Sequence, residues 1–278
     1  MREFFRSENF LEVETPVRIK SPAPETHIDP IRSEDHFLRT SPELQMKQML
    51  SAGFAKIFQI GPCFRKNETG KLHSEEFTML EWYESGADYL SLIGFTKEML
   101  VFVSESVFHR DYCEFHGGKI KFSGDWEIFT VEEAFAKFAD LSAFEAAEKD
   151  MFDEILVTQV ENRLPKDRPV ILMDYPAKFA AFARLKDPER KVAERWELYL
   201  GGIEIANAYG ELTDFIEQKK RFDVFTEERK MLGKESPAHD ENFLKAVSHG
   251  LPESAGCALG FDRLVMILTD SPEIASVR

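Results

Sequence analysis

The sequence predicts an α+β domain in which helices flank a mainly antiparallel sheet. Two pairs of strand-like segments fold back on themselves, residues 57–64 with 77–83 and residues 195–200 with 203–209. A polar loop joins the first pair, and two adjacent glycines form a tight turn in the second. Long helical patterns stand apart from these hairpins, which is typical of an α+β domain.

The elements before the first hairpin are short. Residues 1–9 indicate the end of a helix, residues 10–13 a short strand, and a proline-rich loop follows. Ser41 is expected to cap a helix that starts at Pro42 and ends before Gly53, because a serine hydroxyl can accept from the first free N–H groups.

Helical and strand-like patterns then follow the first hairpin. Apolar spacing predicts a long helix over about 88–107, and residues 119–130 are strand-like. Thr130 opens a further helix through a capping box, and residues 169–174 read as a strand.

The C-terminal part contains a charged helix over about 214–232, a strand over 255–259 and a helix over 262–268. The stretch with the weakest pattern, about 109–190, is expected to be a helical insertion. With no repeat or low-complexity linker, residues 1–278 are expected to form a single domain.

Composition restricts the classes of function. The formal net charge of −15 works against a long polyanionic partner such as duplex DNA. The start of the chain has no apolar signal-peptide core, and charges interrupt every long apolar stretch, so no membrane association is expected. The odd number of cysteines and the absence of a C-x-x-C pair favour reduced thiols in the cytoplasm: Cys63, Cys113 and Cys257.

The first hairpin carries an arginine where its first strand ends. Arg65 is followed by a polar loop that contains Gly70 and two lysines. A guanidinium group offers a rigid fork of donors to phosphate oxygens, so this arrangement suits a phosphate chain. A surface hairpin with a solvated arginine is the alternative.

Two glutamates flank the turn of the second hairpin. Glu197 and Glu204 would repel each other across paired strands unless a cation lay between them, and a magnesium ion that also binds phosphate would remove the conflict. The alternative is two solvated glutamates on opposite faces of the sheet.

A further polar group follows on the same strand. Asn207, Tyr209 and Glu211 share one face by their spacing, whereas Glu204 falls on the other face. A bulge would bring the two groups together, and the sequence leaves this question open.

Two more segments have residues suited to a ligand. Small residues in 256–263 would let a ligand lie against a bare strand, and Arg263 begins a helix, where anions are favoured. Glu81 and Tyr83 share a face with Phe77. A glutamate that points inward beside aromatic rings is costly unless a cation pairs with it, and an edge glutamate in water is the alternative.

Together these segments resemble the catalytic core of class II aminoacyl-tRNA synthetases, in particular the lysyl-tRNA synthetase branch. Residues 10–16, 64–77 and 256–263 resemble the three class motifs in order, and residues 78–83 and 197–214 resemble the amino-acid pocket. The resemblance implies a six- or seven-stranded antiparallel sheet flanked by helices, a homodimer formed through the first motif, and ATP and Mg²⁺ as cofactors.

The resemblance also implies roles for individual residues. Arg65 and Arg263 would be catalytic by holding the α- and γ-phosphates, and Glu197 and Glu204 would bind magnesium. The implied ATP-binding residues are Arg65, Asn67, Glu68, His73, Ser74, Phe77, Glu204, Ile205, Gly260 and Arg263. The implied substrate-binding residues are Ser41, Glu43, Glu81, Tyr83, Asn207, Tyr209, Glu211 and Ala258. The family pattern differs from this chain at Asn67 and Ser74.

The core starts at residue 1, so we expect no anticodon-binding domain and no anticodon-dependent tRNA binding. Residues 40–43 and Ala258 resemble the paralogous family that ligates lysine, preferably (R)-β-lysine, onto a lysine of elongation factor P. The implied function is adenylation of lysine or β-lysine by ATP, followed by transfer to elongation factor P.

Two alternatives remain open from the sequence. One is a truncated lysyl-tRNA synthetase-like enzyme that charges tRNA or a free amine. The other is a non-catalytic regulatory paralogue that binds ATP or an amino acid. The presence of Arg65, Arg263, Glu197 and Glu204 argues against the second, since sensing alone needs no clamp for an α-phosphate.

Overall fold

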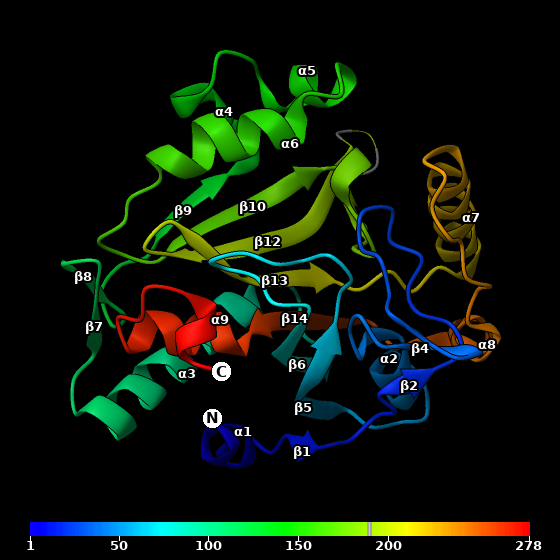
Figure 1. Ribbon diagram of the computed structural model, residues 1–278, viewed down its shortest axis with the longest axis horizontal. Coiled ribbons are helices and arrows are strands. Elements are labelled where there is room, and N and C mark those ends of the chain that lie inside the picture. The colour runs from blue at the N-terminus through cyan, green and yellow to red at the C-terminus, as the bar shows by residue number, and fades with distance from the viewer. Residues whose placement is uncertain (188, 190) are drawn as a thin grey trace.

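A computed structural model describes residues 1–187, 189 and 191–278. Its centre, within these residues, is a nine-stranded sheet in the order β1-β5-β6-β14-β13-β12-β10-β9, with β11 paired to β12 (Figure 1). The strands are β1 Leu11–Glu12, β5 Lys56–Phe64, β6 Glu76–Ser85, β14 Ser254–Gly260, β13 Ile203–Gly210, β12 Val192–Leu200, β10 Val170–Pro176, β9 Glu127–Thr130 and β11 Leu185–Asp187. The strands from β5 to β10 are antiparallel, and β1 and β9 pair in parallel at the edges. The predicted fold class is confirmed, and short edge strands account for the larger strand number.

Both predicted hairpins are present. In β5–β6, Ile57 pairs with Tyr83, and the hairpin extends beyond the predicted segments at both ends. In β12–β13 the turn residues Gly201 and Gly202 have φ of 60° and 82°. Positive φ at both turn positions matches the right-handed twist of the flanking strands and favours glycine.

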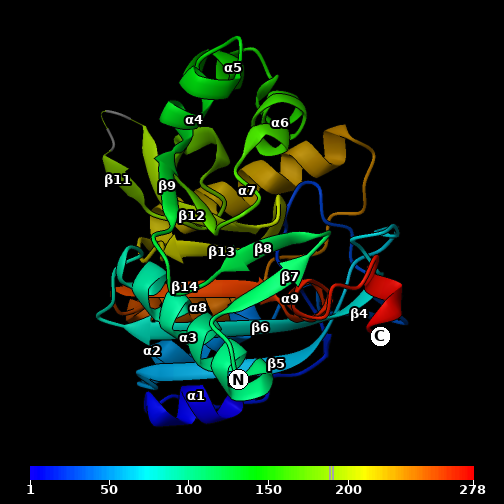
Figure 2. The same ribbon diagram turned by 90° about the vertical axis from the view of Figure 1, so that its left-hand side faces the viewer.

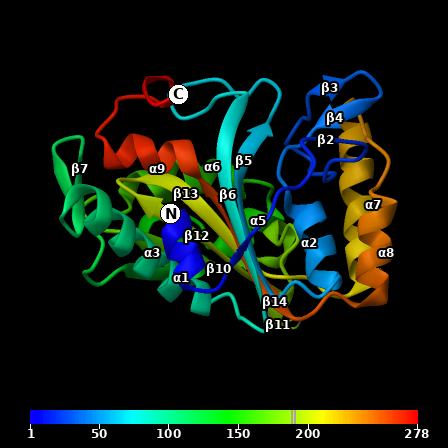
Figure 3. The same ribbon diagram turned by 90° about the horizontal axis from the view of Figure 1, so that it is seen from below.

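The helices surround the sheet in separate groups. They are α1 Arg2–Ser7, α2 Glu43–Ser51, α3 Ser91–Phe108, α4 Val131–Phe138, α5 Ala143–Glu148, α6 Phe152–Ile155, α7 Phe215–Met231, α8 Glu241–Gly250 and α9 Phe261–Leu268. Figure 2 shows α4, α5 and α6 at the β10 end of the sheet and α1 at the opposite end, beneath β5. Figure 3 shows α2, α7 and α8 together on one side of the β5–β6 hairpin and α3 and α9 on the other.

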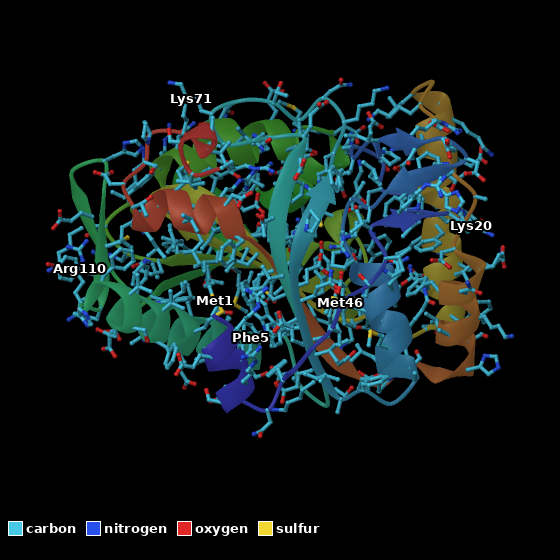
Figure 4. All side chains as sticks on the ribbon, turned by 60° about the horizontal axis from the view of Figure 1, so that its bottom comes forward. Met1, Phe5, Lys20, Met46, Lys71 and Arg110 are labelled. Carbon is cyan, nitrogen blue, oxygen red and sulfur yellow. The ribbon has the colours of Figure 1, made fainter. Side chains whose placement is uncertain are left out.

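The main core lies on one face of the sheet. Phe5 of α1 is fully buried and stacks on Phe58 of β5, with ring centroids 4.5 Å apart (Figure 4). Leu80 and Trp82 of β6 are buried in the same cluster. Because side chains alternate along a strand, the residues between them point to the opposite face. That face remains available for a ligand.

The structure differs from the predicted helices, strands and loops in three places. The predicted strand over 119–130 is two strands in different sheets, β8 Gly118–Lys121 and β9, with a bend between them. β8 pairs with β7 Tyr112–Phe115. The proline-rich loop contains a small three-stranded sheet, and α8 had no predicted counterpart. The small sheet is formed by β2 Arg18–Ile19, β4 His36–Leu38 and β3 Arg32–Ser33.

The first residue of α2 is also corrected. The helix starts at Glu43 with Pro42 as its N-cap, one residue later than predicted. The Ser41 hydroxyl still accepts from the Glu43 N–H at 3.0 Å, so the serine stabilises the helix start from one position further out. The capping box at Thr130 is confirmed, with Glu133 as its second member.

The middle of the chain is not helical throughout. Helices α4–α6, a π-helical turn Leu156–Val160 and a 3₁₀ turn Glu161–Arg163 cover β10, while β9 and β10 themselves belong to the main sheet. That residues 109–190 form an inserted unit with these boundaries therefore stays a prediction. In the described parts of the chain, no helix combines the length and apolarity that crossing a membrane requires. All three cysteines are free and buried.

Candidate active site

A cavity of about 450 Å³ lies on the face of the sheet opposite the main core. It is lined by every predicted site residue except Asn67. Residues without a predicted role also line it: Glu25, Ile28, Leu72, Thr78, Met79, Ala181, Arg195, Gly256, Cys257, Asp262 and Ile274. The segments identified in the sequence therefore meet at one site.

The alternation of β6 places its polar residues in this cavity. Phe77, Glu81 and Tyr83 line the cavity, whereas Leu80 and Trp82 are buried in the core on the other side. The predicted common face of Glu81, Tyr83 and Phe77 is confirmed, and the alternative of an edge glutamate in water is wrong because Glu81 is only 1% exposed.

A β-bulge resolves the question about Glu204. Leu198 pairs with Ala206, but the next residue, Tyr199, pairs with Glu204, so Ile205 is an extra residue in β13. The extra residue reverses the alternation, and Glu204 turns to the same side as Asn207.

Arg65 follows directly after β5 and points into the cavity. Its guanidinium carbon lies 5.1 Å from the centre of the Phe77 ring, and its Nη1 lies 3.8 Å from a Glu68 carboxylate oxygen. Its Nε is buried without a hydrogen-bond partner among the described residues. A buried donor without a partner is costly, and a ligand anion would supply the missing acceptor.

Arg263 is held at the other side of the cavity, near the start of α9. It donates to the Leu72 and Glu204 carbonyl oxygens at 3.1 and 2.8 Å and contacts the His73 Nε2 at 2.7 Å. Partial burial and the nearby Arg263 charge lower the pKa of His73, so the imidazole is neutral and can accept from this arginine. The loop after β5 and the bulged part of β13 are thus joined by one side chain.

The tip of that loop points away from the site. Lys71 is exposed and lies outside the cavity lining (Figure 4). Asn67 also lies outside the lining and is exposed with φ of 64°, although its role was implied by the resemblance. Ser74 lines the cavity, and its hydroxyl accepts from the Arg278 guanidinium at 3.0 Å.

The two acidic residues of the second hairpin are held very differently. Glu197 is 6% exposed and accepts from the hydroxyls of Tyr175 and Tyr199 at 2.6 and 2.7 Å and from Arg195 at 2.5 Å. Among the residues that the structure describes, Glu204 has one ionic contact, with Arg263 at 3.6 Å. Its side chain is 41% accessible to solvent but is enclosed by the cavity walls. Burial there, followed by the charge of Glu197, raises the pKa of Glu204 to about 7.

This pair suits a magnesium ion that also binds phosphate oxygens. Among the described residues, no group of three or more His, Cys, Asp or Glu side chains could hold a metal alone. Carboxylate oxygens are ligands that Mg²⁺ prefers, and it usually completes its shell with water and substrate phosphates. The repulsion that raises the pKa of Glu204 would be relieved by such a cation.

A second acidic group lies at the other end of the cavity. Glu81 accepts from the Ser41 hydroxyl at 2.6 Å and from the Tyr83 hydroxyl at 2.9 Å. Burial, and next the Glu43 carboxylate, raise the pKa of Glu81 to about 7. No cation pairs with Glu81 among the described residues, so this carboxylate is available to bind the ammonium group of a ligand.

Lys47 of α2 is a member of this group that sequence reasoning missed. Its ammonium is 1% exposed, lies 2.5 Å from a Glu211 oxygen and also contacts Glu43. Burial alone would lower its pKa, but the Glu211 and Glu43 charges raise it above its ordinary value. The chain therefore supplies its own cation here. Its position four residues after Glu43 on a helix was a signal that could have identified it.

The floor of this end is formed by β14. A methyl group at Gly256 would lie 2.3 Å from the Tyr83 ring and 2.5 Å from Glu211 Oε1, so glycine is required for close packing. Next to it, Ala258 pairs with Asn207, whose Oδ1 is buried without a partner among the described residues. Tyr209 lines the same wall, 5.8 Å from the Arg195 guanidinium.

Arg195 and Glu25 were also missed. Arg195 lies two residues before Glu197 on the same face of β12, and period-two spacing could have identified it. Glu25 belongs to the loop between β2 and β3 of the small sheet, and no local pattern marks it.

Comparisons with known proteins agree with this geometry. The family described as tRNA synthetases class II (D, K and N) matches residues 1–278. An elongation factor P–(R)-β-lysine ligase from Avibacterium paragallinarum is 36% identical over 281 residues, covering 96% of this chain and 87% of that protein. Another from Enterobacter sp. (strain 638) is 35% identical over 295 residues, covering 100% and 90%.

A relative with a different name is also similar. A lysine–tRNA ligase from Thiobacillus denitrificans is 32% identical over 303 residues, covering 100% of this chain but 60% of that protein. Since the family match spans residues 1–278 and the two ligase relatives are 35–36% identical over 87–90% of their own length, the chain belongs to the class II tRNA synthetase family.

Proposed function

We propose that the chain is an ATP-dependent ligase that activates lysine or (R)-β-lysine as an adenylate and transfers it to a lysine side chain of elongation factor P. One observation carries the proposal. Arg65 and Arg263, far apart in the sequence, line one cavity whose other end contains Glu81. The relatives named elongation factor P–(R)-β-lysine ligase support this substrate and acceptor.

In the first step the substrate carboxylate attacks the α-phosphorus of ATP and pyrophosphate leaves. Arg65 holds the α-phosphate and the reacting carboxylate, and Arg263 holds the γ-phosphate. Phe77 already carries the Arg65 guanidinium on its face and forms the adenine wall with His73. Positioning and charge neutralisation provide the acceleration, and no protein nucleophile is needed.

The remaining nucleotide contacts come from the same walls. Glu68, Ser74, Ile205 and Gly260 line the nucleotide half of the cavity. Asn67 would reach the nucleotide only if its loop changed conformation. A magnesium ion would be held by Glu197 and Glu204, where it supplies positive charge to the phosphates as pyrophosphate develops.

The substrate's side-chain ammonium binds Glu81, beside the Tyr83 hydroxyl and the Glu211 carboxylate. Glu43, Ser41 and Asn207 contact the amino and carboxylate ends. Tyr209 and Ala258 complete the wall and the floor. When all three carboxylates are ionised, the net charge of Glu43, Glu81, Glu211 and Lys47 is −2, which matches the two ammonium groups of a diamino acid.

In the second step the Nζ of the acceptor lysine attacks the adenylate carbonyl and an amide forms. We further propose a cytoplasmic homodimer that does not depend on a tRNA anticodon. The first class motif, residues 10–16, would supply the dimer interface.

A second candidate is transfer to tRNA. The similarity to a lysine–tRNA ligase over the whole of this chain favours it. A regulatory paralogue that binds without catalysis is a weaker candidate, because the Arg65 Nε in the cavity has no hydrogen-bond partner in the described part of the chain.

Incubation with ATP, Mg²⁺ and labelled lysine or (R)-β-lysine, with either elongation factor P or tRNA as acceptor, tests the proposal. We expect pyrophosphate exchange with a basic amino acid and label on elongation factor P. Label on tRNA alone would refute the acceptor, and absence of exchange would refute the enzyme.

A further inference from the structure

The proposed transfer step, on which this inference rests, needs a group that removes a proton. When the acceptor nitrogen attacks the adenylate carbonyl, the product amide keeps one hydrogen fewer than the neutral amine. A carboxylate within the cavity could accept this proton if its oxygens were not already engaged.

Glu25 is the carboxylate in the cavity that meets this condition. Within the described residues, its side chain has no hydrogen bond or ion pair, whereas every other carboxylate that lines the cavity has one. Glu43 and Glu211 pair with Lys47, Glu68 with Arg65, Glu81 with Ser41 and Tyr83, Glu197 with Arg195, Glu204 with Arg263, and Asp262 with the Thr78 N–H.

Glu25 also lies at the right place in the cavity. It lines the cavity together with Arg65 and Glu43, and its loop lies beside the Arg65 segment, because the Lys66 N–H donates to the Asp29 carbonyl oxygen at 2.7 Å. In the proposed complex, Arg65 binds the reacting carboxylate and Glu43 the amino end of the substrate. The Glu25 side chain is therefore near the carbon at which the amide forms.

The loop that carries Glu25 is firmly held. Arg229 of α7 is 2% exposed and donates to the Glu25 and Ile28 carbonyl oxygens at 2.7 and 2.9 Å. It also donates to Asp29 Oδ1 at 2.9 Å, and the Lys66 N–H donates to the Asp29 carbonyl oxygen at 2.7 Å. A fixed backbone keeps Glu25 at a constant distance from the reacting groups, as catalysis by a positioned base requires.

We infer that Glu25 is the general base of the transfer step. The acceptor lysine attacks as a neutral amine, and its nitrogen forms a bond to the adenylate carbonyl carbon. Glu25 takes one proton from that nitrogen. The bond between the carbonyl carbon and the phosphate oxygen breaks, and AMP leaves with the electron pair, so the charges and atoms balance.

The chemistry of the carboxylate agrees with this role. Burial raises the pKa of Glu25 to about 7, partly opposed by Arg65. A general base is most effective when its pKa lies near the working pH.

The test compares two acceptors for the same adenylate. Hydroxylamine is a small and weakly basic nucleophile whose adduct loses its proton readily to water, so it traps the adenylate as a hydroxamate without a protein base. The adduct of the strongly basic lysine amine of elongation factor P loses its proton less readily and needs a base. In Glu25→Gln we expect the ratio of elongation factor P labelling to hydroxamate formation to fall by about 100-fold. Because both rates are measured on one preparation, a partly unfolded sample does not change the ratio.

Two further arms complete the test. In Glu25→Ala, added formate should restore labelling of elongation factor P, because it can take the place of the missing carboxylate. Glu34→Gln, the same change at a side chain that is 89% exposed on the β3–β4 turn, should keep the wild-type ratio.

The outcomes are distinguishable. If the ratio of elongation factor P labelling to hydroxamate formation in Glu25→Gln stayed within about twofold of the wild-type ratio, the role of Glu25 would be overturned but the proposed function would stand. A raised KM for lysine with an unchanged ratio would lead to the same conclusion. Failure of the wild-type protein to form lysine hydroxamate with ATP would overturn the proposed function, and the base with it.

Discussion

The cavity contains two acidic sites that are neutralised in different ways. At the substrate end, Glu43 and Glu211 share the ammonium of Lys47, which belongs to the chain and is 1% exposed. At the end where we propose that the nucleotide binds, Glu197 is held by Arg195 and two tyrosine hydroxyls, but Glu204 has one ionic contact with a described residue, at 3.6 Å. The first site contains a cation that belongs to the protein. At the second site, the negative charge of Glu204 can be neutralised by a cation from solution.

The difference assigns separate tasks to the two ends. A fixed internal cation holds Glu43 and Glu211 in place before any ligand binds, whereas Glu81 has no ion pair among the described residues. In the proposed function, the incomplete site at the other end would make the binding of nucleotide and metal mutually dependent, because phosphate oxygens would complete the metal's ligands. The following predictions are arranged by the size of the expected effect.

Replacement of Lys47 by methionine should have the largest effect. It leaves Glu43 and Glu211 buried without a cation, and breaking a buried ion pair costs about 3–5 kcal/mol of the free energy of unfolding. Urea denaturation at pH 8 measures this loss. The loss should shrink as the pH falls, because a buried carboxyl with a raised pKa destabilises the fold only in its charged form.

The matched control is Lys47→Met combined with Glu211→Gln, which removes one of the two uncompensated charges. We expect this double variant to regain part of the stability lost in Lys47→Met at pH 8. A Lys47→Met protein as stable as wild type would show that Lys47 is not the counter-ion of this site.

The contrast between the two ends was only partly predictable from the sequence. The hairpins, and the face shared by Glu81 and Tyr83, followed from period-two alternation. The bulge at Ile205 did not, because a single extra residue in a strand leaves no compositional mark. The alternation along the strands therefore identified which polar residues face the cavity, but it did not decide on which face of the sheet Glu204 lies.

The sequence also did not show which side chains from other parts of the chain join the site. Lys47 and Arg195 had usable signals, in helix spacing from Glu43 and in strand spacing from Glu197. Glu25 had none, since its position depends on Arg229, a helix residue far away in the chain. Tertiary hydrogen bonds of this kind cannot be deduced from composition or periodicity. The place of the two arginines that we propose to bind phosphate, Arg65 and Arg263, was predictable because each follows a recognisable strand end.

Gly256→Ala should have the next largest effect and acts on the substrate end alone. The added methyl would lie 2.3 Å from the Tyr83 ring and 2.5 Å from Glu211 Oε1. Overpacking of this kind costs about 1–3 kcal/mol. Isothermal calorimetry should show weaker lysine binding at unchanged affinity for an ATP analogue, with Gly70→Ala as a control where nothing lies within 4 Å. Equal loss of both affinities would contradict the separation of the two ends.

Glu204→Gln should affect the nucleotide end alone. We expect the affinity for Mn²⁺, measured by electron paramagnetic resonance in the presence of a non-hydrolysable ATP analogue, to fall by about 10- to 100-fold. Lysine binding without nucleotide should stay at the wild-type level, because Glu81 and Lys47 are untouched. Unchanged Mn²⁺ affinity would mean that the cation lies elsewhere.

The smallest effect expected is the pH dependence of substrate affinity, and it examines the claim that Glu81 is the carboxylate left for the ligand. Burial, with help from Glu43, raises its pKa to about 7, so the carboxylate is mostly protonated at pH 6 and mostly ionised at pH 8. Since an ammonium group binds the ionised form, the dissociation constant for lysine should be about tenfold larger at pH 6 than at pH 8. Calorimetric titration across this range measures it, and Glu81→Gln should flatten the profile.

Glu211 also has a pKa raised to about 7 by burial, but Lys47 opposes that rise. A substrate ammonium near Lys47 would meet repulsion, whereas one at Glu81 would not. Glu211→Gln should therefore keep most of the pH dependence that Glu81→Gln removes. If the two variants exchanged these profiles, Lys47 would have to leave its place when the substrate binds, and the internal cation would be part of a moving switch instead of a fixed support.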